Sequence, residues 1–215
     1  MHELRAEVAT ACRALARKGL GGGIGGHVSR RDGTSFWVNR LDREFAEIGD
    51  DDVVRVDIAT GELLEGPSEP SPGIGFHNAI YLARPEVGGI VHTHADWVSA
   101  LAALRRPLRM LNIRSTFFYD DIVVCPDDDL ESVAPSLGTR SALLIPYHGA
   151  ITVGVDAGHA TALHVALEEA AAVDVRLAGV EVEPMADDDA AAMKKIMESA
   201  DYLRHSWDLL TRQAA

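Results

Sequence analysis

The sequence has few cysteines, a shortage of basic residues and no long uninterrupted apolar run. Its two cysteines, Cys12 and Cys125, are too few for a disulfide framework and lack the spacing of a thiolate metal site. Twenty Lys and Arg residues face 33 Asp and Glu residues, and the net charge of −13 disfavours nucleic acids and anionic membranes as partners. The charged N-terminal stretch does not look like a signal peptide, and no later stretch is long and apolar enough to span a bilayer. We therefore expect a cytoplasmic protein whose partner is a small molecule.

Strand-like and helix-like patterns alternate along the chain. With 215 residues, of which 47% are hydrophobic, the chain is long enough to bury one substantial core, and we expect a single domain over residues 1–215. Apolar spacing predicts helices over residues 2–18, 76–83, 95–104, 158–178 and 189–212. It predicts strands over residues 27–30, 35–39, 53–57, 62–64, 87–92, 143–145 and 151–153. These patterns indicate an α/β fold, in which helices cover a central sheet.

Two histidines stand two residues apart at the end of an apolar run. Residues i and i+2 of an extended chain point to the same face, so His92 and His94 are placed to bind one ion. Neutral imidazole is a ligand for zinc, manganese, iron or nickel. The alternative is that the two histidines only end a strand.

A third histidine favours the metal interpretation. His148 follows another apolar strand and precedes Gly149, which allows the backbone to bend sharply beside a site. Three imidazoles leave coordination positions open for water or substrate, which is typical of a catalytic metal. His27 and His77 are candidates to face the same pocket. The other histidines are interpreted as structural or solvated: His2, His159, His164 and His205.

Five motifs in this order resemble the class II aldolase/adducin family over roughly residues 3–180. They are Gly25–Arg30, Phe36–Asn39, Phe76–Tyr81 with Arg84-Pro85, Val91–His94 and His148–Gly154. The resemblance implies a three-layer α/β/α sandwich with a central, largely antiparallel sheet, and a homotetramer with active sites at subunit interfaces. It also implies that His92, His94 and His148 hold one divalent ion, either Zn, Mn or Fe.

The sequence departs from the family where a catalytic carboxylate is expected. The family's Ser-Ser-Glu motif is replaced by Ser71-Pro72-Gly73, and Glu69 is the nearest carboxylate that could substitute. The glycine-rich phosphate loop also differs, because its hydroxyl and amide positions read Ile24, Gly25 and His27. The sequence therefore disfavours a sugar phosphate as substrate.

A metal site without an obvious base favours decarboxylation, which needs an electron sink more than a proton abstractor. The family includes decarboxylases of hydroxylated aromatic and pyridine carboxylates, whose Gly-His-(Val/Ile)-Ser-Xaa-Arg turn is similar to the one here. We therefore expect a metal-dependent carbon–carbon lyase, foremost a decarboxylase of a non-phosphorylated hydroxy- or oxo-carboxylate, aromatic acids included. The catalytic candidates are His27, Glu69 and Tyr119. The substrate-binding candidates are Arg30, Ser71, His77, Arg114 and Tyr147.

Three other functions stay open. The first is a class II aldolase or dehydratase that uses Glu69 as its acid or base. The second is a non-haem iron oxygenase, since open positions on Fe(II) accept both substrate and dioxygen. The third is a non-catalytic assembly module like the adducin head domain, against which the retention of all three histidines argues.

Overall fold

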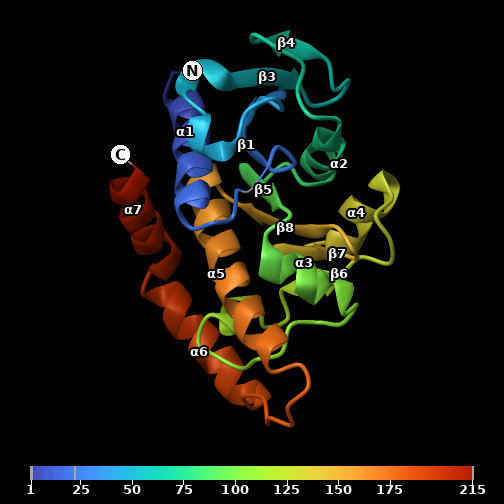
Figure 1. Ribbon diagram of the computed structural model, residues 1–215, viewed down its shortest axis with the longest axis vertical. Coiled ribbons are helices and arrows are strands. Elements are labelled where there is room, and N and C mark those ends of the chain that lie inside the picture. The colour runs from blue at the N-terminus through green and yellow to red at the C-terminus, as the bar shows by residue number, and fades with distance from the viewer. Residues whose placement is uncertain (1, 22, 215) are drawn as a thin grey trace.

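Eight strands and seven helices make up the fold of the computed structural model, which describes residues 2–21 and 23–214 (Figure 1). The strands are β1 His27–Asp32, β2 Ser35–Asn39, β3 Val53–Asp57, β4 Leu63–Glu65, β5 Gly89–Thr93, β6 Ile122–Val124, β7 Ala142–Ile145 and β8 Gly149–Gly154. The helices are α1 His2–Arg17, α2 Gly75–Ala83, α3 Asp96–Ala103, α4 Leu130–Leu137, α5 Ala157–Arg176, α6 Asp187–Ser199 and α7 Tyr202–Ala214. Among these residues, no helix combines the length and apolarity needed to cross a bilayer.

The strands form one sheet in the order β4-β3-β2-β1-β5-β8-β7-β6. All neighbours are antiparallel except β6 and β7, which run parallel. The predicted hairpin is present, and Gly33 supplies its positive φ of 62° between β1 and β2. β5 lies inside the sheet, where it is hydrogen-bonded to β1 on one side and to β8 on the other.

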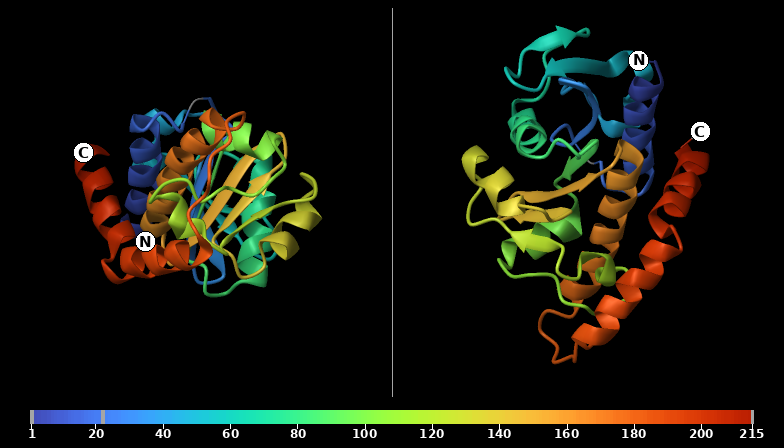
Figure 2. Two further views of the ribbon diagram at one scale, coloured as in Figure 1. Left: turned by 90° about the horizontal axis from the view of Figure 1, so that it is seen from below. Right: turned by 180° about the vertical axis from the view of Figure 1, so that it is seen from behind.

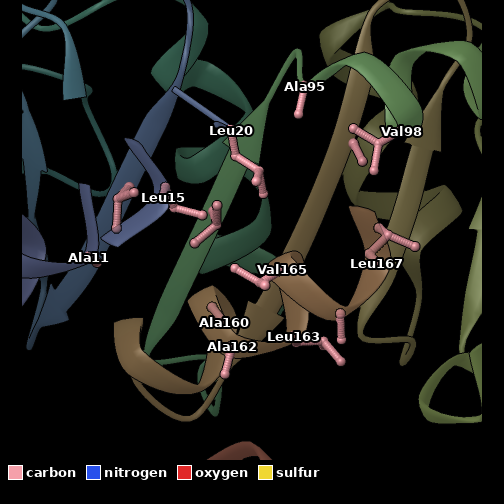
Figure 3. Packing of buried hydrophobic residues seen from close by; sticks show 14 of the residues in the cluster. Ala11, Leu15, Leu20, Ala95, Val98, Ala160, Ala162, Leu163, Val165 and Leu167 are labelled. Carbon is pink, nitrogen blue, oxygen red and sulfur yellow. The ribbon is translucent and has the colours of Figure 1, made fainter. Parts of the chain in front are cut away.

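The sheet separates two apolar cores. One face packs against α1, α3 and α5, and the other packs against α2 and α4, so Figure 2 shows the sheet between two helical layers. Figure 3 shows the first core from close by, with Leu15 of α1, Val98 of α3 and Val165 of α5 among its buried side chains. The expected three-layer sandwich with a largely antiparallel sheet is confirmed.

The C-terminal region differs from its prediction. A single helix was expected over 189–212, but the chain forms α6 and α7 with a break at Ala200 and Asp201. Asp201 adopts a positive φ of 51°, a conformation that aspartate tolerates better than most residues and that ends the helical geometry. α7 then packs against α1 and α5 (Figure 1). β6 and α4 were not predicted from the apolar pattern.

A buried ion pair fixes the end of α5. The Asp174 side chain is 0% exposed and accepts hydrogen bonds from Arg106 Nη2 and Arg109 Nε, each at 2.7 Å. We expect Asp174→Ala to lower the free energy of unfolding by about 2–3 kcal/mol. This loss is smaller than that for a fully buried ion pair, because both guanidinium groups are partly exposed to solvent. Glu169→Ala on the same helix is the control, because its pair with Arg114 is half exposed and contributes about 1 kcal/mol or less. Urea unfolding of both variants measures the difference, and equal losses would contradict the expectation.

Candidate metal centre and active site

The three predicted ligands converge at one end of the sheet. His92 lies in β5, His94 follows directly after β5, and His148 lies in the turn between β7 and β8. Because β5 pairs antiparallel with β8, the end of β5 meets the start of β8, and Thr93 stands opposite Ala150. One nitrogen from each of the three imidazoles lies within 4.8 Å of the others. The sheet topology thus brings residues 54 positions apart in sequence to one point.

The donor set fits a divalent metal ion. Nδ1 of His92 is 2.9 Å from the carbonyl oxygen of Ala150, which can only accept, so Nδ1 carries the proton and Nε2 presents its lone pair. Nε2 of His92 lies 3.0 Å from Nε2 of His94. Two nitrogens bound to one zinc at about 2.0 Å lie roughly 3.3 Å apart, so His92 and His94 need little movement. The full set, whose nitrogens lie within 4.8 Å, would close further around an ion. A ligand that donates its other N–H to a carbonyl is typical of metal-binding histidines.

The electrostatics of the site keep its imidazoles uncharged. Burial, followed by the neighbouring His94 and His148, lowers the pKa of His27 to about 4. Burial also lowers the pKa of His92 well below its ordinary value, and partial burial lowers the pKa of His94 and of His148. At neutral pH these rings are therefore neutral, which is the form that binds a metal.

Two loops approach the histidines so closely that only glycine fits. A Cβ added to Gly25 would lie 2.7 Å from Nδ1 of His94. A Cβ added to Gly73 would lie 2.5 Å from Cε1 of His27 and 3.0 Å from its Nε2. Both distances are far inside van der Waals contact. The space that a side chain at residue 73 would need is therefore filled by the imidazole of His27.

A serine holds His27 beside the three candidate ligands His92, His94 and His148, which are called the triad from here on. Its ring is 3% exposed, its Nε2 lies 2.9 Å from Oγ of Ser71, and its centroid is 5.3 Å from that of His92. Nδ1 of His27 is buried and has no hydrogen-bond partner among the described residues. The ring of Phe76 packs edge-on against His92 and against His148, at centroid distances of 5.9 and 5.8 Å, so the site has one apolar wall.

His77 lies behind His27 and belongs to a separate hydrogen-bond chain. Its Nδ1 is 2.7 Å from Oγ of Ser29, which is 2.8 Å from the hydroxyl of Tyr81. Its Nε2 is buried without a partner among the described residues, and its ring centroid is 5.5 Å from that of His27. The predictions for His27, Ser71 and His77 thus fall within one cluster. Ser29 and Tyr81 were not singled out, although Ser29 follows His27 by two residues and therefore shares its face.

The structure does not bring the two predicted arginines to the cluster. Arg30 is three residues from His27, so it points to the opposite face of the sheet, where it pairs with Glu7 at 3.1 Å and donates to the carbonyl of Gly88. Arg114 was expected near the substrate, but it stands before the 3₁₀ turn Ser115–Phe118 and pairs with Glu169 of α5. Both guanidinium groups therefore have partners within this chain and away from the triad.

Three further candidates lie outside the cluster. Tyr119 comes just before β6, at the end of the β6–β7 pair opposite to His148, and its carbonyl accepts from Nζ of Lys194. Glu69 is exposed in the loop before α2, two residues from Ser71. Tyr147 adjoins His148 but is 74% exposed, with a positive φ of 61° and the Arg105 guanidinium 5.8 Å from its ring centroid. Within this chain, Tyr119 and Tyr147 do not face the triad.

The family model described as the class II aldolase and adducin N-terminal domain matches residues 6–175. The chain belongs to this family. The structure resembles the L-fuculose 1-phosphate aldolase of Glaciozyma antarctica with a TM-score of 0.91 and 27% identity, over 99% of this chain and 88% of that one. The resemblance expected from the motifs is therefore confirmed, together with the fold.

Curated relatives of this class II aldolase/adducin chain include an aldolase and a decarboxylase. The 5-methylthioribulose-1-phosphate/5-deoxyribulose-1-phosphate aldolase of Rhodospirillum rubrum is 31% identical over 78% of each protein. The decarboxylase NovR of Streptomyces niveus is 31% identical over 68% of this chain and 59% of NovR. The meiotically up-regulated gene 14 protein of Schizosaccharomyces pombe is 31% identical over 73% of this chain and 65% of that protein. The chain thus spans less than two thirds of the last two relatives.

Proposed function

We propose that this protein is a metal-dependent carbon–carbon lyase, foremost a decarboxylase of a non-phosphorylated hydroxy- or oxo-carboxylate. One observation carries the proposal: the His27 ring fills the space beside the triad that a side chain at residue 73 would need. Residue 73 corresponds to the glutamate of the Ser-Ser-Glu motif that the family resemblance implies for the aldolases. In this chain the residue is glycine, and the imidazole of His27 lies where that side chain would be. The similarity to the decarboxylase NovR supports this assignment.

We propose that His92, His94 and His148 hold the ion, which is zinc, manganese or iron. When bound, the ion supplies a Lewis acid that stabilises negative charge on a substrate oxygen. In the reaction, the bond between the substrate carbon and its carboxylate breaks, carbon dioxide leaves, and the electron pair stays on carbon and delocalises into the adjacent carbonyl. The carbon then takes up one proton.

The residues of this chain would position the acid and deliver that proton. His27 is buried and its Nε2 is held by Ser71, so its ring is fixed and its unpartnered Nδ1 is the atom we assign to proton transfer. The neutral ring would donate from Nδ1 while Nε2 takes up a proton from the Ser71 hydroxyl, which solvent replaces. Phe76 closes one side with an apolar ring, which excludes water and suits a planar, aromatic acid. His77 fixes the other side of His27 through its edge-on ring contact.

Aldol cleavage is the second candidate, because an aldolase is 31% identical over 78% of the chain. It would need a carboxylate, and Glu69 is two residues before the serine that holds His27. The glycine-rich loop supplies Ile24, which is 53% exposed, where a phosphate would require polar groups. The proposed substrate is therefore not a sugar phosphate.

The test is a substrate screen with the protein loaded separately with Zn²⁺, Mn²⁺ and Fe²⁺. We expect release of carbon dioxide from hydroxy- or oxo-carboxylates and no cleavage of sugar phosphates. We also expect Glu69→Gln to retain full carbon dioxide release, because Glu69 is exposed and the proposed proton transfer uses His27. His27→Gln, in contrast, should reduce the rate by about 10²- to 10⁴-fold, the usual contribution of a positioned acid or base.

Other outcomes of the screen favour other functions. Sugar phosphate cleavage that Glu69→Gln abolishes would establish the aldolase. Consumption of dioxygen with Fe²⁺ alone would establish the oxygenase. If no metal-loaded form turned over any acid, the assembly module would be favoured. We further propose a homotetramer formed by one-domain chains of residues 1–215, with active sites at the subunit interfaces.

A further inference from the structure

α5 carries two buried polar side chains one helical turn apart, His164 and Glu168, that face the segment on either side of His94. His164 is 0% exposed and Glu168 is 8% exposed. Residues four apart share a helix face, so both side chains reach the junction between β5 and α3. The proposed reaction uses neither of them.

The hydrogen bonds of His164 can be assigned by counting donors. The hydroxyl of Thr152 donates to the carbonyl of Ala160 at 2.9 Å, so its oxygen must accept from Nδ1 of His164 at 3.0 Å. A neutral imidazole has one N–H, and burial lowers the pKa of His164 to about 3. Nε2 therefore accepts from the hydroxyl of Thr93 at 2.8 Å. Each polar atom in this chain of contacts has one defined role.

This chain of hydrogen bonds continues around His94. Oγ1 of Thr93 also accepts a hydrogen bond from the amide of Ala95 at 3.3 Å. The Thr93 hydroxyl thus links the residue before His94 to the residue after it. Oε1 and Oε2 of Glu168 accept from the amides of Trp97 and Val98, at 3.0 and 2.8 Å, and so cap the first turn of α3. The backbone before and after His94 is thereby anchored to α5.

His94 needs this anchoring more than His92 does. Nδ1 of His92 bonds to the carbonyl of Ala150, whereas Nδ1 of His94 has no hydrogen-bond partner within the described chain. His94 is also the exposed member of the triad. Apart from the 3.0 Å contact of its Nε2 with Nε2 of His92, no hydrogen bond from the described residues orients the His94 ring, so its position depends on the backbone that carries it.

We propose that Thr93, His164 and Glu168 are positioning residues that hold His94 for metal binding through its backbone. The inference rests on the proposed function, since it assumes that the triad binds an ion. Groups that orient a metal ligand typically contribute about 10- to 100-fold to metal affinity. We expect Thr93→Val and Glu168→Gln each to weaken binding by about that factor.

Co²⁺ binding to the metal-free protein tests the proposal, with the titrated affinity and the visible absorption spectrum as readouts. α5 supplies matched controls. Thr161→Val removes a buried hydroxyl without a hydrogen-bond partner in the part of the chain that the structure describes, and Glu169→Gln changes the neighbouring, half-exposed carboxylate. Both controls should bind Co²⁺ as the wild type does. Thr93→Ser, which keeps the hydroxyl, should restore the affinity lost in Thr93→Val. A purely structural role would lower the unfolding temperature without changing the spectrum.

Wild-type affinity and spectrum in folded Thr93→Val and Glu168→Gln would overturn the inference. If Thr93→Val does not fold, His164→Asn tests the inference in its place. The asparagine amide is shorter than imidazole, so it can bond to Thr152 but cannot reach Thr93. Unchanged Co²⁺ binding in that variant would equally overturn the inference. If the wild-type protein bound no Co²⁺ at all, the metal site itself would be refuted, which is a distinct result and removes the proposed function as well.

Discussion

Replacing His92 and His94 together by alanine is expected to remove the bound metal and to lower lyase activity by at least about 10³-fold. The variant keeps one imidazole of the three, and a single neutral nitrogen does not hold a divalent ion against water. A bound Lewis acid stabilises the negative charge that develops in the transition state by several kcal/mol. Each 1.36 kcal/mol of that stabilisation corresponds to a factor of ten in rate, so its loss accounts for the expected decrease. Elemental mass spectrometry of protein purified without added ions measures the metal, and carbon dioxide release measures the activity.

The matched control is His205→Ala, which removes an exposed histidine of α7. It should retain about one equivalent of metal and full activity. Metal that persisted at one equivalent in the double variant would show that the ion binds elsewhere. A double variant that lost the metal but kept its activity would contradict a metal-dependent reaction.

Gly73→Ala is the second change with a large expected effect. Its new Cβ would lie 2.5 Å from Cε1 of His27, and that ring cannot withdraw easily because it is buried beside Ser71 and His92. We expect the free energy of unfolding to fall by about 1–3 kcal/mol, the usual cost of overpacking. Activity should fall as well, because either His27 or the loop before α2 must move. Urea unfolding and carbon dioxide release measure the two effects.

A double-mutant cycle separates this clash from a general effect of alanine in the loop. In His27→Ala/Gly73→Ala the obstructing ring is absent, so the combined loss of stability should be smaller than the sum of the single losses by about 1 kcal/mol or more. Gly49→Ala is a control for the loss of glycine, since its Cβ would meet only Asp52 Oδ2 at an ordinary 3.6 Å. Simple additivity in the cycle would show that the two residues do not compete for space.

Local patterns were sufficient to predict the elements around the triad. Side chains alternate between the two faces of a strand, which placed His92 and His94 on one face. His148 was predicted at a strand end because it lies between an apolar run and Gly149. The same alternation could have excluded Arg30, because it stands three positions after His27, and an odd offset puts two side chains on opposite faces of a strand. The pairing of β5 with β8, which brings His148 to the other two, is a long-range contact that no local pattern contains.

Other features could not be read from the sequence for physical reasons. His164 was interpreted as structural or solvated, because its role depends on Thr93 and Thr152 from two different strands. The helix break at Asp201 involves neither glycine nor proline, so composition did not reveal it. Arg114 was nominated for its charge alone, and its partner Glu169 lies on a helix far away in sequence.

The position of β5 inside the sheet determines how the centre can open. His92 and Thr93 belong to a strand bonded on both sides, so their amides exchange with solvent only when the middle of the sheet separates. His148 lies in a turn next to the exposed Tyr147, where local opening costs far less free energy. An ion held by the triad would therefore lose His148 first, and its residence time would be set by the motion of this turn rather than by the strand.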